Sequence, residues 1–226
     1  MCEFSLHQGV VMIVINFDEY NLNRKTILKE VPSSLFVYPT DTVYGIGCNA
    51  LDEKLVNKVR KLKKSAQPFS VIVPNKEWIY ENCVVTEEAE EWVRKLPGPY
   101  TLLLKLKNKK AVSKNVHNYD MNGDVILGVR MPNHWFLAIS YTLKIPIVTT
   151  SANVTGQNFM TSLEDLDPVI RNGVDYVFYE GPKHGTPSTI VHLGGDKVKI
   201  LPRADNRVSH TNIAFPLKEI NTIRKR

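Results

Sequence analysis

Cysteine is scarce in this chain, and its few cysteines form no recognisable pattern. Cys2, Cys48 and Cys83 are odd in number and far apart in sequence, and no C-x-x-C pair occurs. These features argue against a disulfide framework and a structural zinc site. Reduced cysteines are typical of the cytosol, so we expect a cytoplasmic protein.

Long apolar runs and the common nucleotide- and metal-binding motifs are also missing. The longest apolar run, Gly9–Ile15, is far shorter than the roughly 20 residues that span a bilayer, and it predicts a strand instead. The chain contains no Walker A, G-x-G-x-x-G or G-x-S-x-G motif, and no H-x-x-x-H pair. We therefore expect neither a resident metal nor a membrane partner.

Positive charge, by contrast, is abundant. Lysine and arginine together number 29 against 23 acidic residues, which gives a net charge of +6 with histidine neutral. Basic residues gather at 54–64, at 105–114 and in the last three positions. This balance favours polyanionic partners such as nucleotides or RNA, although a single cluster of this kind is more often a solvated face.

Short apolar runs alternate with amphipathic segments along all 226 residues, without a repeat or a shift in composition. We predict strands at 11–17, 35–38, 69–73, 101–106, 125–131, 145–149, 176–179, 189–193 and 197–201. We predict helices at 52–62, 86–96, 135–143 and 163–171, the first two with Asp52 and Thr86 as N-caps. This alternation predicts one α/β domain, residues 1–226, with a mixed sheet.

Three polar segments are candidate sites, and each has two interpretations. PTDTVYG follows a strand and could hold a polar ligand, or it could only close a turn through Thr40. The basic helix end could bind a triphosphate through Lys61 and Lys63, or it could complement the helix dipole. SANVTG lies at the carboxyl end of a strand, where α/β proteins bind ligands, but it could also be an ordinary loop.

Taken together, six ordered segments carry a more specific signal: PTDTVYG, K-x-K, LPGPYTLLL, VRMPNH, SANVTG and STIV. Over residues 35–203 they resemble the YrdC-like family of threonylcarbamoyl-AMP synthases. The resemblance implies a strongly twisted, open mixed α/β sheet with flanking helices and a basic concave cleft. It implies that L-threonine and bicarbonate form threonylcarbamate, which attacks ATP to give threonylcarbamoyl-AMP and pyrophosphate. Mg²⁺ would accompany ATP, and a partner complex would transfer the threonylcarbamoyl group to tRNA.

The same resemblance implies roles for individual residues. L-threonine would contact Thr40, Arg130, Ser151 and Ser188, with the Arg130 guanidinium paired to the substrate carboxylate. ATP would contact Lys61, Lys63, Gln67, Asn153, Thr161 and Arg203. The implied catalytic set is Lys61, Lys63, Ser151 and Asn153.

Lys63 stands where most members of the family have arginine, and the two cations are not interchangeable at a bidentate site. This departure leaves open a YrdC-like paralogue without synthase activity. A protein that binds duplex RNA through its phosphates is a second alternative, which explains the charge but not Thr40 or Arg130. A carbamoyl-handling domain of hydrogenase maturation is disfavoured, because those proteins are much larger and carry zinc-finger cysteines.

Overall fold

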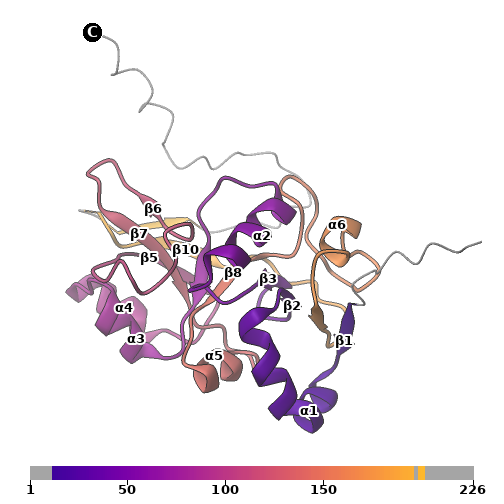
Figure 1. The fold of residues 1–226 in the computed structure, drawn as a ribbon. Helices are drawn as coiled ribbons and strands as arrows, with labels where there is room; N and C mark the ends of the chain where they lie inside the picture. The colour runs from indigo at the N-terminus through magenta and orange to yellow at the C-terminus, as the bar shows by residue number, and fades with distance from the viewer. Residues whose placement is uncertain (1–11, 196–197, 202–226) are drawn as a thin grey trace, which may run out of the picture.

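A mixed β-sheet flanked by helices forms the architecture of this protein in a computed structural model that describes residues 12–195 and 198–201 (Figure 1). The strands are β1 (Ile13–Ile15), β2 (Phe36–Tyr38), β3 (Gly45–Gly47), β4 (Ser70–Ile72), β5 (Tyr100–Lys105), β6 (Asn118–Tyr119), β7 (Val125–Arg130), β8 (Ile147–Ser151), β9 (Tyr176–Phe178), β10 (Thr189–His192) and β11 (Lys199–Leu201). The helices are α1 (Phe17–Glu30), α2 (Glu53–Lys63), α3 (Lys76–Asn82), α4 (Glu87–Arg94), α5 (Leu137–Leu143) and α6 (Pro168–Arg171), with a 3₁₀ turn at Val31–Ser33.

The sheet is open, and its neighbours are mostly distant in sequence. The strand order is β1-β9-β2-β3-β8-β4-β7-β5-β10-β11, with β6 paired to β7. Parallel pairs such as β4–β7 and β5–β10 alternate with antiparallel pairs such as β4–β8 and β5–β7. The predicted twisted, mixed α/β sheet is therefore confirmed, and its topology brings the polar ends of distant segments together.

Alternate side chains of the strands face opposite sides of the sheet, as the two-residue period of a strand requires, and the buried ones form two large hydrophobic cores and one small cluster. Val37 and Val71 belong to the larger core, which α2, α3 and α4 cover. Phe36, Tyr38 and Ile72 point the other way, into a second core that includes residues of α1 and α5. The second core spans only part of its face, and a small third cluster of Leu103, Ile126 and Ile190 lies on β5, β7 and β10.

The N-terminal third of the chain contains more structure than the sequence predicted. The strand expected at 11–17 is limited to 13–15, and residue 11 lies outside the described residues. Asn16 then begins α1 with a capping box, in which its side chain accepts from the Glu19 amide and the Glu19 carboxylate accepts from the Asn16 amide. This capping box was the signal for a helix that we did not predict.

Other elements also differ from the prediction in extent. We did not predict α3, β3 or β6, and the helix expected at 163–171 is regular only over 168–171. The strand expected at 197–201 begins at Lys199, and residue 197 lies outside the described residues. Asp52 and Thr86 cap α2 and α4 as predicted. Among the described residues, no helix is long and apolar enough to cross a membrane.

Candidate active site

A cavity of about 440 Å³ lies on the sheet face that carries the small cluster Leu103, Ile126 and Ile190. Small-molecule sites commonly have this size. Most of its floor comes from alternate residues of five strands. These are Thr149 and Ser151 of β8, Ser70 of β4, Ile126, Gly128 and Arg130 of β7, Thr101 and Leu103 of β5, and Ile190 and His192 of β10, and Thr150 of β8 and Gly45 of β3 also line the cavity.

Gly128 is the central position of this floor. Strand pairing places it opposite Ser70 on one side and Leu103 on the other. A Cβ atom at residue 128 would lie 2.4 Å from the Ser70 Oγ and 3.3 Å from the Leu103 Cδ2. Glycine therefore leaves space over the sheet that any other residue would occupy.

The four residues predicted for L-threonine all line this cavity. Thr40 follows β2, Arg130 ends β7, Ser151 ends β8, and Ser188 precedes β10. Thr40, Arg130 and Ser188 are each less than 9% exposed. Segments that are far apart in sequence thus supply several hydroxyl groups and one guanidinium to a single cavity, and this set can hold a small zwitterion with a hydroxyl group.

The guanidinium of Arg130 is buried and only partly paired. Its Nη2 lies 3.3 Å from Asp41 Oδ1 and 3.1 Å from Thr42 Oγ1. Burial lowers the pKa of Arg130, and the Asp41 carboxylate opposes that shift. Within the described residues, Nη1 and Nε donate no hydrogen bond, and Nε is buried. Arg130 therefore retains unused donors at the cavity wall.

Thr40 closes a turn and also lines the cavity. Its hydroxyl donates to the Val43 carbonyl at 2.7 Å and accepts from the Thr42 amide at 3.1 Å, which closes the turn. The same residue also lines the cavity. The turn therefore fixes a hydroxyl oxygen at the cavity wall.

Ser188 reaches the cavity on an irregular segment, residues 179–188, that joins β9 to β10. Its hydroxyl lies 2.7 Å from the hydroxyl of Thr101. The Glu180 carboxylate anchors the segment to the turn before α5 because it accepts from His134 and Trp135 at 3.0 Å, and it also accepts from Lys183 of the same segment at 2.6 Å. Burial alone would raise the pKa of Glu180, but these donors outweigh burial and lower it.

Asn153, which follows β8, connects α2 to the cavity. Its Oδ1 accepts from the Ser151 hydroxyl at 2.6 Å and from the Lys63 ammonium at 3.1 Å. The same ammonium donates to the backbone carbonyls of Ser151 and Asn153, at 2.6 and 2.7 Å. Burial lowers the pKa of Lys63 to about 7.

The residues predicted for ATP do not line this cavity together, unlike the four residues predicted for L-threonine. Lys61 and Gln67 are exposed, Lys63 and Asn153 are buried, and none of the four lines the cavity. The Thr161 hydroxyl donates to the Asp165 carboxylate. Arg203 lies outside the described residues. The ATP contacts therefore remain a prediction.

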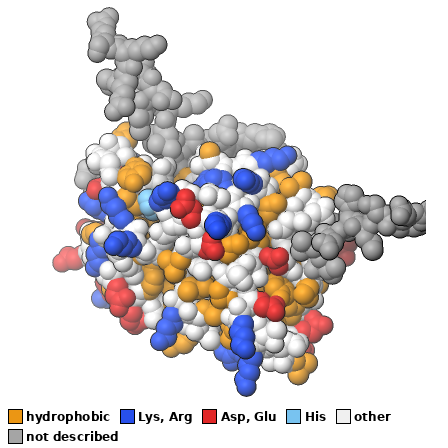
Figure 2. Space-filling view, in the orientation of Figure 1, with side chains coloured by type: hydrophobic (Ala, Val, Ile, Leu, Met, Phe, Trp, Pro, Cys, Tyr) orange, Lys and Arg blue, Asp and Glu red, His pale blue; other side chains and the backbone are white. Residues whose placement is uncertain are grey.

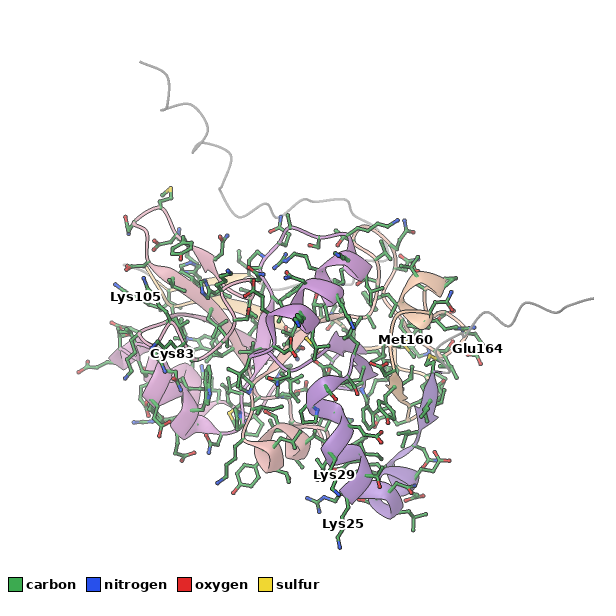
Figure 3. The ribbon with its side chains drawn as sticks, in the orientation of Figure 1. Lys25, Lys29, Cys83, Lys105, Met160 and Glu164 are labelled. Atoms are coloured by element: carbon green, nitrogen blue, oxygen red, sulfur yellow. The ribbon has the colours of Figure 1, made fainter. Side chains whose placement is uncertain are left out.

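Most of the positive charge lies away from the cavity lining. Lys and Arg side chains gather on the face around α2 (Figure 2), while Lys25 and Lys29 extend from α1 and Lys105 lies near the β6–β7 hairpin (Figure 3). The lining itself includes Arg130, Lys199 and His192 together with Asp120. The basic character of the cleft thus stays a prediction.

Sequence reasoning missed much of the far end of the cavity. Its residues are Asn118–Asn122 of the β6–β7 hairpin, His192, Gly194, Gly195 and Lys199. The alternation of Ser188, Ile190 and His192 was the available signal, because residues two apart in a strand face the same side. The described residues contain no cluster of three or more potential metal ligands.

The fold and the cavity together define an α/β protein with a polar cavity on one sheet face. The model of the Sua5/YciO/YrdC family, which is described as "Telomere recombination", matches residues 33–204. The match covers about three quarters of the sequence, and the chain belongs to this family.

Individual relatives agree with this assignment. The chain is 35% identical over 191 residues to a putative threonylcarbamoyl-AMP synthase of Methanocaldococcus jannaschii, covering 79% of this chain and 87% of that protein. It superposes on Pyrococcus abyssi Sua5 complexed with L-threonine, with a TM-score of 0.73 and 26% identity, over 84% of this chain and 56% of the other. Escherichia coli YciO has the same fold, with a TM-score of 0.72, 20% identity and coverage of 85% and 95%.

Proposed function

We propose that this protein is a threonylcarbamoyl-AMP synthase and that its cavity binds L-threonine. The observation that carries the proposal is the convergence of Thr40, Arg130, Ser151 and Ser188 on one cavity. The similarity to a putative synthase over most of both chains supports the same activity. A Sua5 structure complexed with L-threonine supports the choice of ligand.

In the proposed complex, the threonine carboxylate accepts hydrogen bonds from the Nη1 group of Arg130, which has no partner among the described residues. A planar guanidinium suits a carboxylate, and burial strengthens the interaction. Asp41 holds Arg130 in place through Nη2 without using its other nitrogens. The hydroxyl groups of Thr40 and Ser188 then surround the rest of the amino acid.

The proposed reaction has two steps. The threonine amine forms an N–C bond with the carbon of bicarbonate, which releases water and leaves a carbamate. A carbamate oxygen then attacks the α-phosphorus of ATP, and the bond to the pyrophosphate breaks. We propose that Mg²⁺ enters with ATP as the counter-ion of the triphosphate, as is usual for such substrates.

The synthase would be a nucleotidyltransferase acting in the cytoplasm. Its product would pass to a tRNA-modifying complex that transfers the threonylcarbamoyl group, and the basic surface around α2 would allow contact with RNA. We propose that Lys61, Gln67, Asn153, Thr161 and Arg203 contribute to the ATP side of the reaction, as the family resemblance implies.

Incubation with ATP, bicarbonate and labelled L-threonine tests this proposal. We expect pyrophosphate and a labelled adenylate only when threonine and bicarbonate are both present. Pyrophosphate release that is equally fast with serine, or after rigorous removal of bicarbonate, would contradict it. Binding of duplex RNA at physiological salt without any consumption of ATP would favour the RNA-binding alternative.

A further inference from the structure

Lys63 differs from the other lysines at the end of α2 in where its side chain lies. It is 5% exposed, whereas Lys58, Lys61 and Lys64 are exposed. The reason is helical geometry, because Lys63 lies four residues after the buried Val59 and so continues the buried face of α2. The K-x-K pair therefore places one ammonium outside and one inside the protein.

The loop that follows β8 accepts every hydrogen bond that the buried Lys63 ammonium can donate. A lysine ammonium has three N–H donors. Its three acceptors are the carbonyls of Ser151 and Asn153, at 2.6 and 2.7 Å, and the Oδ1 of Asn153 at 3.1 Å. The protonated side chain therefore has no donor left for a phosphate group, and the neutral amine that forms above its pKa of about 7 has only two N–H donors for the same three acceptors.

These bonds determine how Asn153 and Ser151 are oriented. Because Oδ1 accepts from both Lys63 and Ser151, the Nδ2 group must face the other way, and it donates to the Gln157 carbonyl at 2.7 Å. The Thr155 amide also donates to the Lys63 carbonyl at 3.0 Å. Lys63 thus holds the loop with both its side chain and its backbone.

We infer that Lys63 is a positioning residue that holds Asn153, and through it the Ser151 hydroxyl, in place at the cavity, and that it is not a ligand of the ATP phosphates. The inference depends on the proposed function only for the task of Ser151 and Asn153 in the reaction. The hydroxyl proton of Ser151 is directed to Asn153 Oδ1, so its oxygen presents lone pairs to the cavity.

The substitution Lys63→Met tests this inference, with Lys58→Met on the exposed side of the same helix as the matched control. Methionine keeps the side chain as far as the ε position but lacks the terminal nitrogen, so it donates no hydrogen bond. In Lys63→Met we expect amide hydrogen exchange in residues 151–157 to rise by about tenfold or more. We expect ATP affinity to stay within about threefold of wild type and kcat to fall by about 10²-fold.

Two results would each overturn the inference. One is a loss of ATP affinity of about tenfold or more in Lys63→Met, and the other is unchanged hydrogen exchange in the loop. If Lys63→Met does not fold, Lys63→Gln replaces it, because the shorter amide still offers donors to part of the set. A wild-type protein that makes no adenylate would overturn the proposed function. Amide hydrogen exchange in residues 151–157 would still decide the role of Lys63.

Discussion

Asp41 and Arg130, 89 residues apart in sequence, form a largely buried ion pair, with Asp41 Oδ1 3.3 Å from Arg130 Nη2, and Arg130 lines the cavity. The other Asp41 oxygen accepts from the Asn133 amide at 2.9 Å. One carboxylate therefore joins the PTDTVYG loop to the end of β7 and to the turn after it. The pair fixes the guanidinium that we propose binds threonine.

Arg130→Ala should weaken threonine binding by about 2–5 kcal/mol, because it removes one partner of a buried charged contact. ATP affinity measured alone should change little. Titration calorimetry with each ligand separately checks this, with circular dichroism to establish that the variant is folded. Arg94→Ala, which removes an exposed ion pair with Glu90 on α4, is the control. Equal losses for both ligands would mean that Arg130 supports the fold instead.

Glu180→Gln should loosen the segment that carries Ser188. The substitution removes the charge that holds His134, Trp135 and Lys183 but keeps the size of the side chain. Because hydrogen bonds to a charged group contribute about 1.5–3 kcal/mol, we expect threonine affinity to fall by about tenfold and hydrogen exchange at the Lys183 amide to increase. An increase in exchange without any change in threonine affinity would show that the anchor does not act on the ligand site.

The sequence predicted the fold class well because the apolar runs of the central strands are strong local signals. It missed α1 because only Tyr20 and Ile27 of that helix are buried, so its apolar stripe is narrow. It missed β3 because glycines flank Ile46, and glycine has a low strand propensity. A Cβ at Gly47 would lie 2.1 Å from the Val148 carbonyl oxygen, a tertiary constraint that no local pattern reveals.

The candidate site could be predicted in part. The motifs pointed to Thr40, Arg130, Ser151 and Ser188, and the sheet topology gathers them around one cavity. The i+4 spacing from Val59 could have placed Lys63 on the buried face of α2, but its contacts with the loop after β8 depend on tertiary packing. The far end of the cavity depends on the β6–β7 hairpin, whose two-residue strand is too short to give a sequence signal.

Gly128→Ala should destabilise the protein, because the new Cβ would lie 2.4 Å from the Ser70 Oγ and 3.0 Å from its Cβ. Overpacking of this kind costs about 1–3 kcal/mol. Ser70→Gly removes both of these atoms, so the double variant should regain part of the lost stability. Chemical unfolding of the two single variants and the double variant measures this coupling. Additive losses would show that the two residues do not compete for the same space.

The pH dependence of stability should show the burial of Lys63. Its pKa falls from 10.5 to about 7 on folding, so between these values the unfolded chain binds more protons than the native protein. Stability must then rise with pH over this window, with a slope that approaches about 1.4 kcal/mol per pH unit.

The most informative range is about pH 7.5 to 8.5. The lowered pKa values of His117, His134 and His192 act mainly below it. The raised pKa values of the Cys48 and Cys83 thiols reduce the slope toward its upper end in wild type, Lys63→Met and Lys58→Met alike, so the difference between the proteins reports Lys63. Chemical unfolding at intervals across this range measures the slope. Lys63→Met should abolish most of it, whereas Lys58→Met, on the exposed side of α2, should leave it unchanged. A slope that is the same in all three proteins would show that Lys63 keeps its proton on burial, held by the carbonyls of Ser151 and Asn153.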